Sequence, residues 1–324
     1  MTNSVTALPS FDTDEEFENL KVNTSLFETI ARALITRHHL PDEPLSLFEG
    51  TNIVFACGDH RVIKLYPPMH QHQYESDVLI MEHLHHQLSV STPALEFHGE
   101  IQGWPYIIMS RLEGTLLEGL WETLDHANKI IIIRELGALI REVHALPTNG
   151  LESIDSHWQT FIRQQIDQCV SRHRELKLSD ALLQEIPKYL DSIEPLLLSI
   201  NKPVILTGEY TPMNFLVKQL DGIWHINGLI DFGDAMLGLP QYDLLGPGAF
   251  LIEGDTDLLK AFLLSYGYAP SELTETLSHQ LTALLLLHRY SNLNLQIRIK
   301  GWQDKVRSLK DLEDLVWGIC SHHT

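Results

Sequence analysis

The chain contains little cysteine, little positive charge and no long uncharged apolar run. Its three cysteines, Cys57, Cys169 and Cys320, are widely spaced and form no CxxC pair, so the sequence predicts neither a disulfide framework nor a zinc site. No uncharged stretch reaches the roughly 18 residues of a membrane-spanning helix, and the N-terminus lacks the basic and apolar segments of a signal peptide. We therefore expect a cytoplasmic protein without a membrane partner.

Basic residues are strongly outnumbered by acidic ones. The sequence has 43 Asp and Glu against 23 Lys and Arg, which gives a formal net charge of −20. Because phosphate contacts require Lys and Arg, this balance argues against nucleic acid as a partner. It is compatible with a cationic small molecule, although many proteins are this acidic for solubility alone. With 324 residues, 44% of them hydrophobic, the chain can bury the core of one large domain or of two lobes.

The stretch 204–244 carries polar residues in the pattern of a phosphoryl-transfer site. An apolar run leads into a polar turn with Glu209 and Asn214, and a hairpin then leads to Asp231. Phosphoryl transfer from ATP needs a base or positioner for the acceptor hydroxyl and two oxygen ligands for Mg²⁺. The spacing of Glu209 and Asn214 is that of the kinase catalytic loop. We therefore predict that Glu209 takes or orients the hydroxyl and that Asn214 and Asp231 bind Mg²⁺.

Strands expected within residues 45–66 supply a second group of candidates. Gly50 stands in a tight turn, which either lies over phosphates or is only a hairpin turn. Lys64 lies in an apolar strand, where it must find an anion or reach out to water. Beside the downstream motif we favour the α- and β-phosphates of ATP as that anion. Val62, two residues earlier on the same strand face, would then line the adenine site.

Apolar spacing predicts helices over 25–38, 74–84 and 127–146, whereas residues 1–23 read as a polar, partly ordered lead-in. The helix over 74–84 should present a glutamate that pairs with the strand lysine and holds it in place. Glu75 is our choice and Glu82 is the alternative, because the helical register does not separate them.

The central stretch resembles the Brenner motif of the aminoglycoside phosphotransferases, His-Gly-Asp-x-x-x-x-Asn followed by Ile-Asp-Phe-Gly-Asp. The agreement covers Asn214, residues 230–234 and the Tyr-Asp-Leu sequence at 242–244. Thr207 stands where the family has His, and Glu209 stands where it has the catalytic Asp. The likeness runs from about Leu45 to about Trp317 and is closest to members that phosphorylate hygromycin B.

The resemblance implies an α+β, bilobal protein-kinase-like fold. Residues 1–109 would form the N-terminal lobe, with a small antiparallel sheet and one pairing helix, and residues 110–324 a mainly helical C-terminal lobe. ATP and Mg²⁺ would be the cofactors. In the hinge, Met109 would lie behind the adenine, and the main-chain groups of Ser110 and Leu112 would bind it.

Further roles follow from the same resemblance. Gly233 would let the backbone turn tightly behind the metal ligand, and Asp243 would brace the catalytic loop. Glu253, Asp255 and Asp257 are candidates for an acidic cleft that receives a cationic acceptor, although a helix N-terminus collects acidic residues anyway.

The family leaves the acceptor open, because it also contains kinases of choline, homoserine and similar metabolites. An aminoglycoside such as hygromycin B and a small amino alcohol are both compatible. The unperturbed pKa of a Glu side chain, ~4.3, is close to that of Asp, ~3.9. Its extra methylene moves the carboxylate by ~1.5 Å, which is enough to weaken catalysis. We favour an active kinase over a nucleotide-binding pseudokinase-like protein. A protein kinase is a weaker hypothesis, because no APE-type segment follows Asp231.

Overall fold

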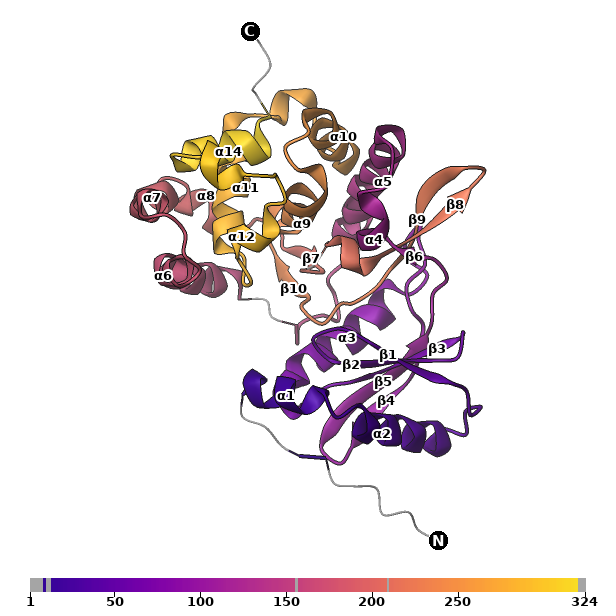
Figure 1. Ribbon diagram of the computed structural model, residues 1–324. Helices are drawn as coiled ribbons and strands as arrows, with labels where there is room; N and C mark the ends of the chain where they lie inside the picture. Colours follow the sequence, from indigo (N-terminus) through magenta and orange to yellow (C-terminus); the bar gives the residue numbers. More distant parts are fainter. Residues whose placement is uncertain (1–7, 10–12, 155–156, 209, 320–324) are drawn as a thin grey trace. The chain divides into compact units, whose positions relative to one another are not determined.

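The computed structural model describes residues 8–9, 13–154, 157–208 and 210–319, and these form two compact units (Figure 1). The first unit contains Met1–Gln87, Ser91–Glu113 and Leu229–Asp234, and the second contains Leu88–Val90, Gly114–Gly228 and Ala235–Thr324. This division differs from the single boundary that we expected after residue 109. The chain returns to the first unit after the hairpin, where the Leu229 amide donates to the Ser91 carbonyl at 3.0 Å.

The helices of the described residues are, in chain order, α1 (Asp14–Lys21), α2 (Thr24–Arg37), η1 (Pro68–His70), α3 (Gln71–Leu84), α4 (Leu117–Trp121), α5 (His126–Ala145), α6 (Trp158–Glu175), α7 (Asp180–Asp191), α8 (Glu194–Leu198), η2 (Pro212–Asn214), η3 (Pro240–Leu244), α9 (Leu245–Pro247), η4 (Gly248–Ile252), α10 (Thr256–Tyr266), η5 (Pro270–Glu272), α11 (Glu275–Leu287), α12 (Leu293–Gln296), α13 (Trp302–Lys305) and α14 (Leu309–Trp317). The strands are β1 (Leu45–Phe48), β2 (Ile53–Cys57), β3 (Arg61–Leu65), β4 (Leu95–Ile101), β5 (Trp104–Ser110), β6 (Thr115–Leu116), β7 (Val204–Leu206), β8 (Phe215–Leu220), β9 (Ile223–Leu229) and β10 (Met236–Gly238).

An antiparallel sheet of order β1-β2-β3-β5-β4 forms the centre of the first unit. Phe55, Ile63 and Ile108 stand opposite one another on neighbouring strands and therefore point to the same face. That face packs on α2 in one buried apolar cluster. Phe17 joins the cluster from α1, so part of the segment that we expected to be a partly ordered lead-in is a helix.

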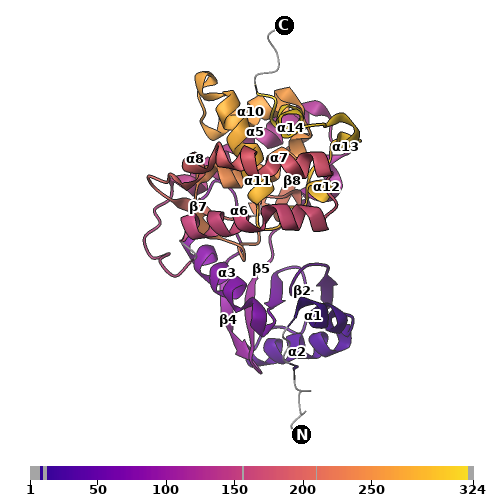
Figure 2. The same ribbon diagram turned by 90° about the vertical axis from the view of Figure 1, so that its left-hand side faces the viewer.

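The other face of this sheet carries Val62 and Lys64, which stand opposite Met109 and Ile107 on β5. Helix α3 packs on this side, as Figures 1 and 2 show and as its contact with Lys64 confirms. Lys64 and Ile107 are buried, whereas Val62 and Met109 are only half-buried. The sheet thus presents a partly open apolar surface beside a buried lysine.

The second unit is mainly helical. Asp125 caps α5 by accepting from the Asn128 amide at 2.8 Å, and α5 packs along α10. The two helices approach closely at Gly137, where an added Cβ would lie 2.5 Å from the carbonyl oxygen of Phe262. Helices α6, α7, α11 and α14 lie side by side (Figure 2). Together with the antiparallel sheet of the first unit, this helical unit confirms the predicted α+β class.

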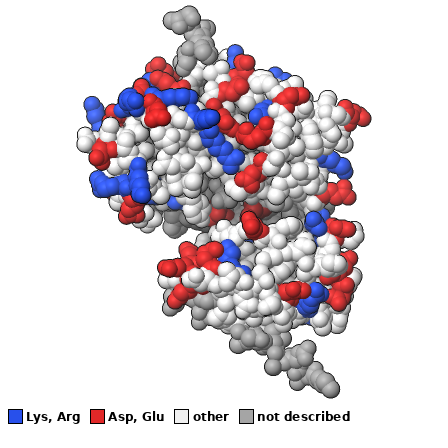
Figure 3. All heavy atoms as spheres, in the orientation of Figure 1, with Lys and Arg blue, Asp and Glu red and all other residues white. Residues whose placement is uncertain are grey.

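Acidic and basic side chains are interspersed on the face shown in Figure 3. None of the helices in the described part of the chain has the length and apolar character that crossing a membrane requires.

Candidate active site

Lys64 is the centre of a charged cluster in the first unit. Its side chain comes from β3 and is 7% exposed. The Nζ atom lies 2.8 Å from Asp77 Oδ2 and 2.8 Å from Asp231 Oδ1. The lysine therefore finds its anions inside the unit, as a buried ammonium must.

Asp77 anchors this cluster from α3. It is 2% exposed and accepts three hydrogen bonds, from Lys64 at 2.8 Å, from the Tyr66 hydroxyl at 2.6 Å and from the Phe232 amide at 2.9 Å. The last bond joins α3 directly to the backbone beside Asp231. One carboxylate thus orients the lysine and holds the segment that carries the second carboxylate.

Our expectation that Glu75 pairs with Lys64 is wrong. Glu75 is exposed and accepts a hydrogen bond from Gln71 on the same helix at 2.9 Å. Two residues correspond to about 200° around a helix, so Glu75 and Asp77 face nearly opposite ways. The buried stripe of α3 contains Asp77, Ile80 and Met81. Apolar spacing alone predicts that Asp77 faces solvent, because Asp is polar. Its position three and four residues before Ile80 and Met81 nevertheless places it on the same helix face as these buried residues.

Asp231 has a left-handed backbone, with φ of 66°, a conformation that Asp tolerates better than most residues. We expected the tight turn to depend on Gly233, but the positive φ lies at Asp231 itself. Gly233 instead permits close packing, since an added Cβ would lie 3.2 Å from Gln73 Cβ and 3.4 Å from Asp77 Oδ2.

Both members of the Lys64–Asp231 pair are ionised at neutral pH. Burial lowers the pKa of Lys64, but the charges of Asp231 and Asp77 outweigh it and raise that pKa above its usual value. Desolvation works to raise the pKa of Asp231, but the Lys64 ammonium and its hydrogen bond outweigh it and leave that pKa below its usual value. The Asp231 side chain is 45% exposed, so an ionised oxygen ligand is open to solvent.

The other predicted nucleotide contacts also lie in the first unit. Gly50 stands in the β1–β2 turn, and its carbonyl accepts from Lys21 at 2.6 Å. Asn52 ties this turn to α3 through a buried bond to Gln73 at 3.0 Å. At the end of β5, the Ser110 hydroxyl and amide exchange hydrogen bonds with the backbone of Ala94, at 2.8 and 2.9 Å. Leu112 follows as a half-buried residue.

The remaining predicted catalytic residues belong to the second unit. Asn214 is 6% exposed and ends η2, with its amide bonded to the Thr211 carbonyl at 3.0 Å. Glu209 lies outside the described residues. Its neighbours Gly208 and Tyr210 are described, and both line a cavity of about 360 Å³.

Asp243 holds the segment before Glu209 in place. Its Oδ1 accepts from the Gly208 amide at 3.1 Å, and its Oδ2 accepts from the Thr207 amide at 3.1 Å. The Oδ2 atom also lies 3.1 Å from His144 Nε2. The resemblance implies that Asp243 braces this loop, and the contact with His144 from α5 was not part of that expectation.

Glu253, Asp255 and Asp257 are not among the residues that line the cavity. Asp255 caps α10 by accepting from the Asp257 and Leu258 amides at 2.9 and 3.0 Å. With His126 the two aspartates form a group whose ligand atoms lie within 4.8 Å of one another, at an accessible position. The cap explains why acidic residues gather at this helix start.

A sequence profile described as the Phosphotransferase enzyme family matches residues 48–276. Among curated proteins, the lysine-specific demethylase JMJ21 of Arabidopsis thaliana is 25% identical over 215 residues, which are 54% of this chain and 23% of that protein. The chain therefore spans about a quarter of the length of this curated relative.

Three solved structures share the fold. The GDP and kanamycin complex of APH(2")-IIia has a TM-score of 0.67 at 18% identity and covers 91% of this chain and 99% of its own. The streptomycin-ATP-APH(2")-IIa ternary complex has a TM-score of 0.59 at 15% identity, with 90% and 96% covered. The macrolide 2'-phosphotransferase MphH from Brachybacterium faecium has a TM-score of 0.53 at 19% identity, with 78% and 89% covered.

Proposed function

The chain belongs to the phosphotransferase enzyme family, and from this premise we propose that it transfers the terminal phosphoryl group of ATP to a hydroxyl group of a small molecule. The observation that carries the proposal is the cluster of Lys64, Asp77 and Asp231 within one unit. A buried lysine held by one carboxylate, with a second and accessible carboxylate beside it, is the arrangement that phosphate and metal binding require.

At the nucleotide end, Lys64 binds the α- and β-phosphates and Asp77 orients it. Phosphate oxygens would replace Asp231 at the lysine and leave the Asp231 carboxylate to a metal ion. The half-buried side chains of Val62 and Met109 face the same side of the sheet as Lys64 and suit the flat apolar adenine. The GDP and ATP complexes of the structural neighbours support a nucleotide at this fold.

Mg²⁺ is the metal that these ligands fit. Asp231 offers an ionised, accessible carboxylate oxygen. The amide oxygen of Asn214 is the second ligand that the resemblance implies. When bound, Mg²⁺ neutralises charge that develops on the phosphate oxygens. The lowered pKa of Asp231 keeps this ligand deprotonated at neutral pH without any metal.

At the acceptor end, Glu209 takes the proton of the hydroxyl. The hydroxyl oxygen forms a bond to the γ-phosphorus, the bond from that phosphorus to the bridging β,γ-oxygen breaks, and ADP leaves. Asp243 holds the amides of Thr207 and Gly208, the two residues that precede Glu209 in the chain. The transfer therefore depends on Asp243 as a positioning residue.

The acceptor proposed from the family is an aminoglycoside such as hygromycin B, or a small amino alcohol. Kanamycin and streptomycin occur in complexes of two structural neighbours, which supports the first class. A third neighbour is a macrolide 2'-phosphotransferase, which widens the range of acceptors to be screened.

The proposal is tested by measuring ADP release from Mg-ATP with a panel of aminoglycosides, macrolides and amino alcohols. We expect release that depends on one acceptor and is lost in Asp231→Ala. Asp191→Ala is the matched control, because Asp191 ends α7 at an exposed position of the second unit. ATP binding without acceptor-dependent release would instead identify a pseudokinase-like protein, in which Glu209 has replaced a working base. Failure to bind Mg-ATP at all would refute both.

A further inference from the structure

The lining of the second unit's cavity differs from what a polycationic acceptor requires. Resting on the proposed function, we propose that the acceptor is a hydroxylated ring compound that carries one carboxylate group rather than several ammonium groups. The cavity borders Gly208, Tyr210 and Thr211, so a molecule bound there lies beside the segment proposed to take the hydroxyl proton. Its volume of about 360 Å³ is near the lower end of the range for small-molecule sites.

Carboxylates for an ammonium group are scarce in the lining. Within the described part of the chain, Asp243 is the one acidic residue that borders the cavity, and its side chain is fully buried. It already accepts from two backbone amides and contacts His144. A ligand with several ammonium groups would lose its hydration here without gaining partners, which is costly.

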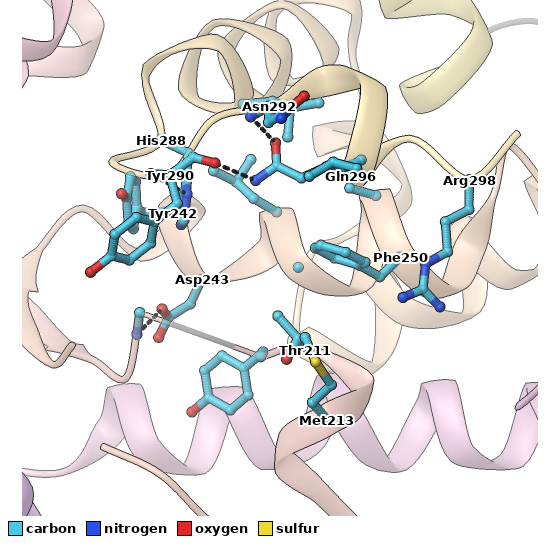
Figure 4. A pocket seen from close by; sticks show the side chains of 17 residues that line it. Thr211, Met213, Tyr242, Asp243, Phe250, His288, Tyr290, Asn292, Gln296 and Arg298 are labelled. Carbon is cyan, nitrogen blue, oxygen red and sulfur yellow. Dashed lines mark hydrogen bonds between the residues drawn. The ribbon is translucent and has the colours of Figure 1, made fainter. Parts of the chain in front are cut away.

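The lining instead supplies a cation. The Arg298 guanidinium lies 5.1 Å from the centre of the Phe250 ring, and Figure 4 shows the two side chains together at one side of the cavity. The ion pair of Arg298 with Glu118 is long, at 3.5 Å. Because a guanidinium has five N–H donors, this one contact leaves other donors of Arg298 for a ligand. A guanidinium beside an aromatic face binds a planar carboxylate well.

Aromatic side chains occupy the opposite side of the cavity. Figure 4 shows Tyr242, His288 and Tyr290 there, and the rings of Tyr242 and His288 stack at 4.9 Å with 16° between their planes. Burial lowers the pKa of His288 to about 4, so this ring adds no positive charge at neutral pH. Flat apolar faces opposite a guanidinium suit a ring with an acidic substituent.

Among the buried side-chain oxygens of the lining, Asn292 Oδ1 and Thr211 Oγ1 have no hydrogen-bond partner within the described part of the chain. Other hydrogen bonds already hold the loop that carries Asn292. The backbone amide of Asn292 donates to Gln296 Oε1 at 3.1 Å, and Gln296 Nε2 donates to the Tyr290 carbonyl at 3.3 Å. Buried polar atoms normally find partners. Hydroxyl groups of a ligand would satisfy both, which supports an acceptor with more than one hydroxyl or N–H donor.

Two probes of matched shape test the proposal. Para-(hydroxymethyl)benzoate and para-(hydroxymethyl)benzylamine share the ring and the reacting hydroxyl but carry opposite charges. ADP release and the phosphate ester in phosphorus NMR are measured for each, and binding is followed by calorimetry. We expect kcat/KM to favour the benzoate by about tenfold or more, and Arg298→Glu to reverse this preference. Arg163→Glu, at an exposed position of α6 outside the lining, is the matched charge reversal and should leave the preference unchanged.

The outcomes separate this proposal from the proposed function. Turnover of aminoglycosides or of the amine probe in preference to the benzoate, insensitive to Arg298→Glu, would overturn the carboxylate proposal and leave the kinase intact. Calorimetric binding of the benzoate that Arg298→Glu abolishes, with no ADP release from any acceptor, would support the cavity's ligand class and refute the transfer. Absence of both binding and turnover of the benzoate overturns the carboxylate proposal whatever other acceptors do.

Discussion

Replacement of Asp77 by Asn tests the central cluster most directly. The change removes one buried negative charge and keeps the shape of the side chain. Lys64 then retains only Asp231, whose side chain is 45% exposed and therefore screened by water. Removing one partner of a buried ion pair typically costs 3–5 kcal/mol. Because Asp231 remains and the Asn oxygen still accepts from the Phe232 amide, we expect a loss just below that range, about 2–3 kcal/mol of unfolding free energy.

The same variant should weaken nucleotide use. Without the Asp77 charge the lysine is no longer oriented, and the Phe232 amide beside Asp231 keeps only a neutral acceptor. Misplacement of about 1 Å at such a site can lower the rate ~10²-fold, so we expect a fall of that order in kcat/KM for ATP. Urea unfolding gives the stability change, and calorimetry with Mg-ATP gives the affinity.

Glu75→Gln is the matched control for this experiment. It removes a carboxylate from the same helix, at an exposed position whose hydrogen bond to Gln71 a Gln oxygen can also accept. We expect changes within about 0.5 kcal/mol and unaltered ATP affinity. Equal losses in the two variants, or a neutral Asp77→Asn, would refute the assignment of Asp77 as the residue that orients Lys64.

Three further predictions concern the second unit. Burial lowers the pKa of His288 from 6.5 to about 4, so the unfolded chain binds a proton at a higher pH than the folded chain does. The unfolding free energy should therefore fall by up to about 3 kcal/mol as the pH drops from 6.5 to 4. Urea unfolding of His288→Gln should show a weaker pH dependence, and an unchanged pH dependence would contradict the assignment to His288. Gly137→Ala places a methyl group against the Phe262 carbonyl and should lower the unfolding free energy by about 1–2 kcal/mol, although Ala has the better helix propensity. A rise in melting temperature would instead show that α5 and α10 can move apart at little cost in free energy. Burial raises the pKa of Cys169 to about 11, so iodoacetamide near neutral pH should leave this thiol unmodified in the native protein and label it in urea, as peptide mass spectrometry can determine.

Much of the fold follows from local patterns. The apolar spacing over 127–146 predicts a helix that the structure has at His126–Ala145, and the pattern over 25–38 corresponds to Thr24–Arg37. These segments are long and periodic, which is where a pattern is most informative. Helix α1 was missed because it buries little besides Phe17, so its sequence shows hardly any apolar stripe.

The partner of Lys64 shows where local patterns stop being informative. The sequence places a lysine in an apolar strand and therefore requires an anion nearby. It does not reveal which acidic residue of the following helix turns inward, since a buried Asp looks polar to any hydrophobic count. Only the packing of α3 on the sheet selects Asp77 and leaves Glu75 in solvent.

By itself, the sequence determined the family, the order of the elements and the residue types that phosphoryl transfer needs, because these depend on spacing along the chain. The tertiary structure decided which groups meet: Asp77 with Lys64, Asp231 with the same lysine across 167 positions, and Asp243 with the amides of Thr207 and Gly208. It also decided the chemistry of the cavity, because the lining combines residues from three separate stretches of the chain, within 208–213, 242–250 and 285–298. Contacts of this kind depend on how helices and strands pack, and packing is a property of the whole folded chain rather than of any short stretch.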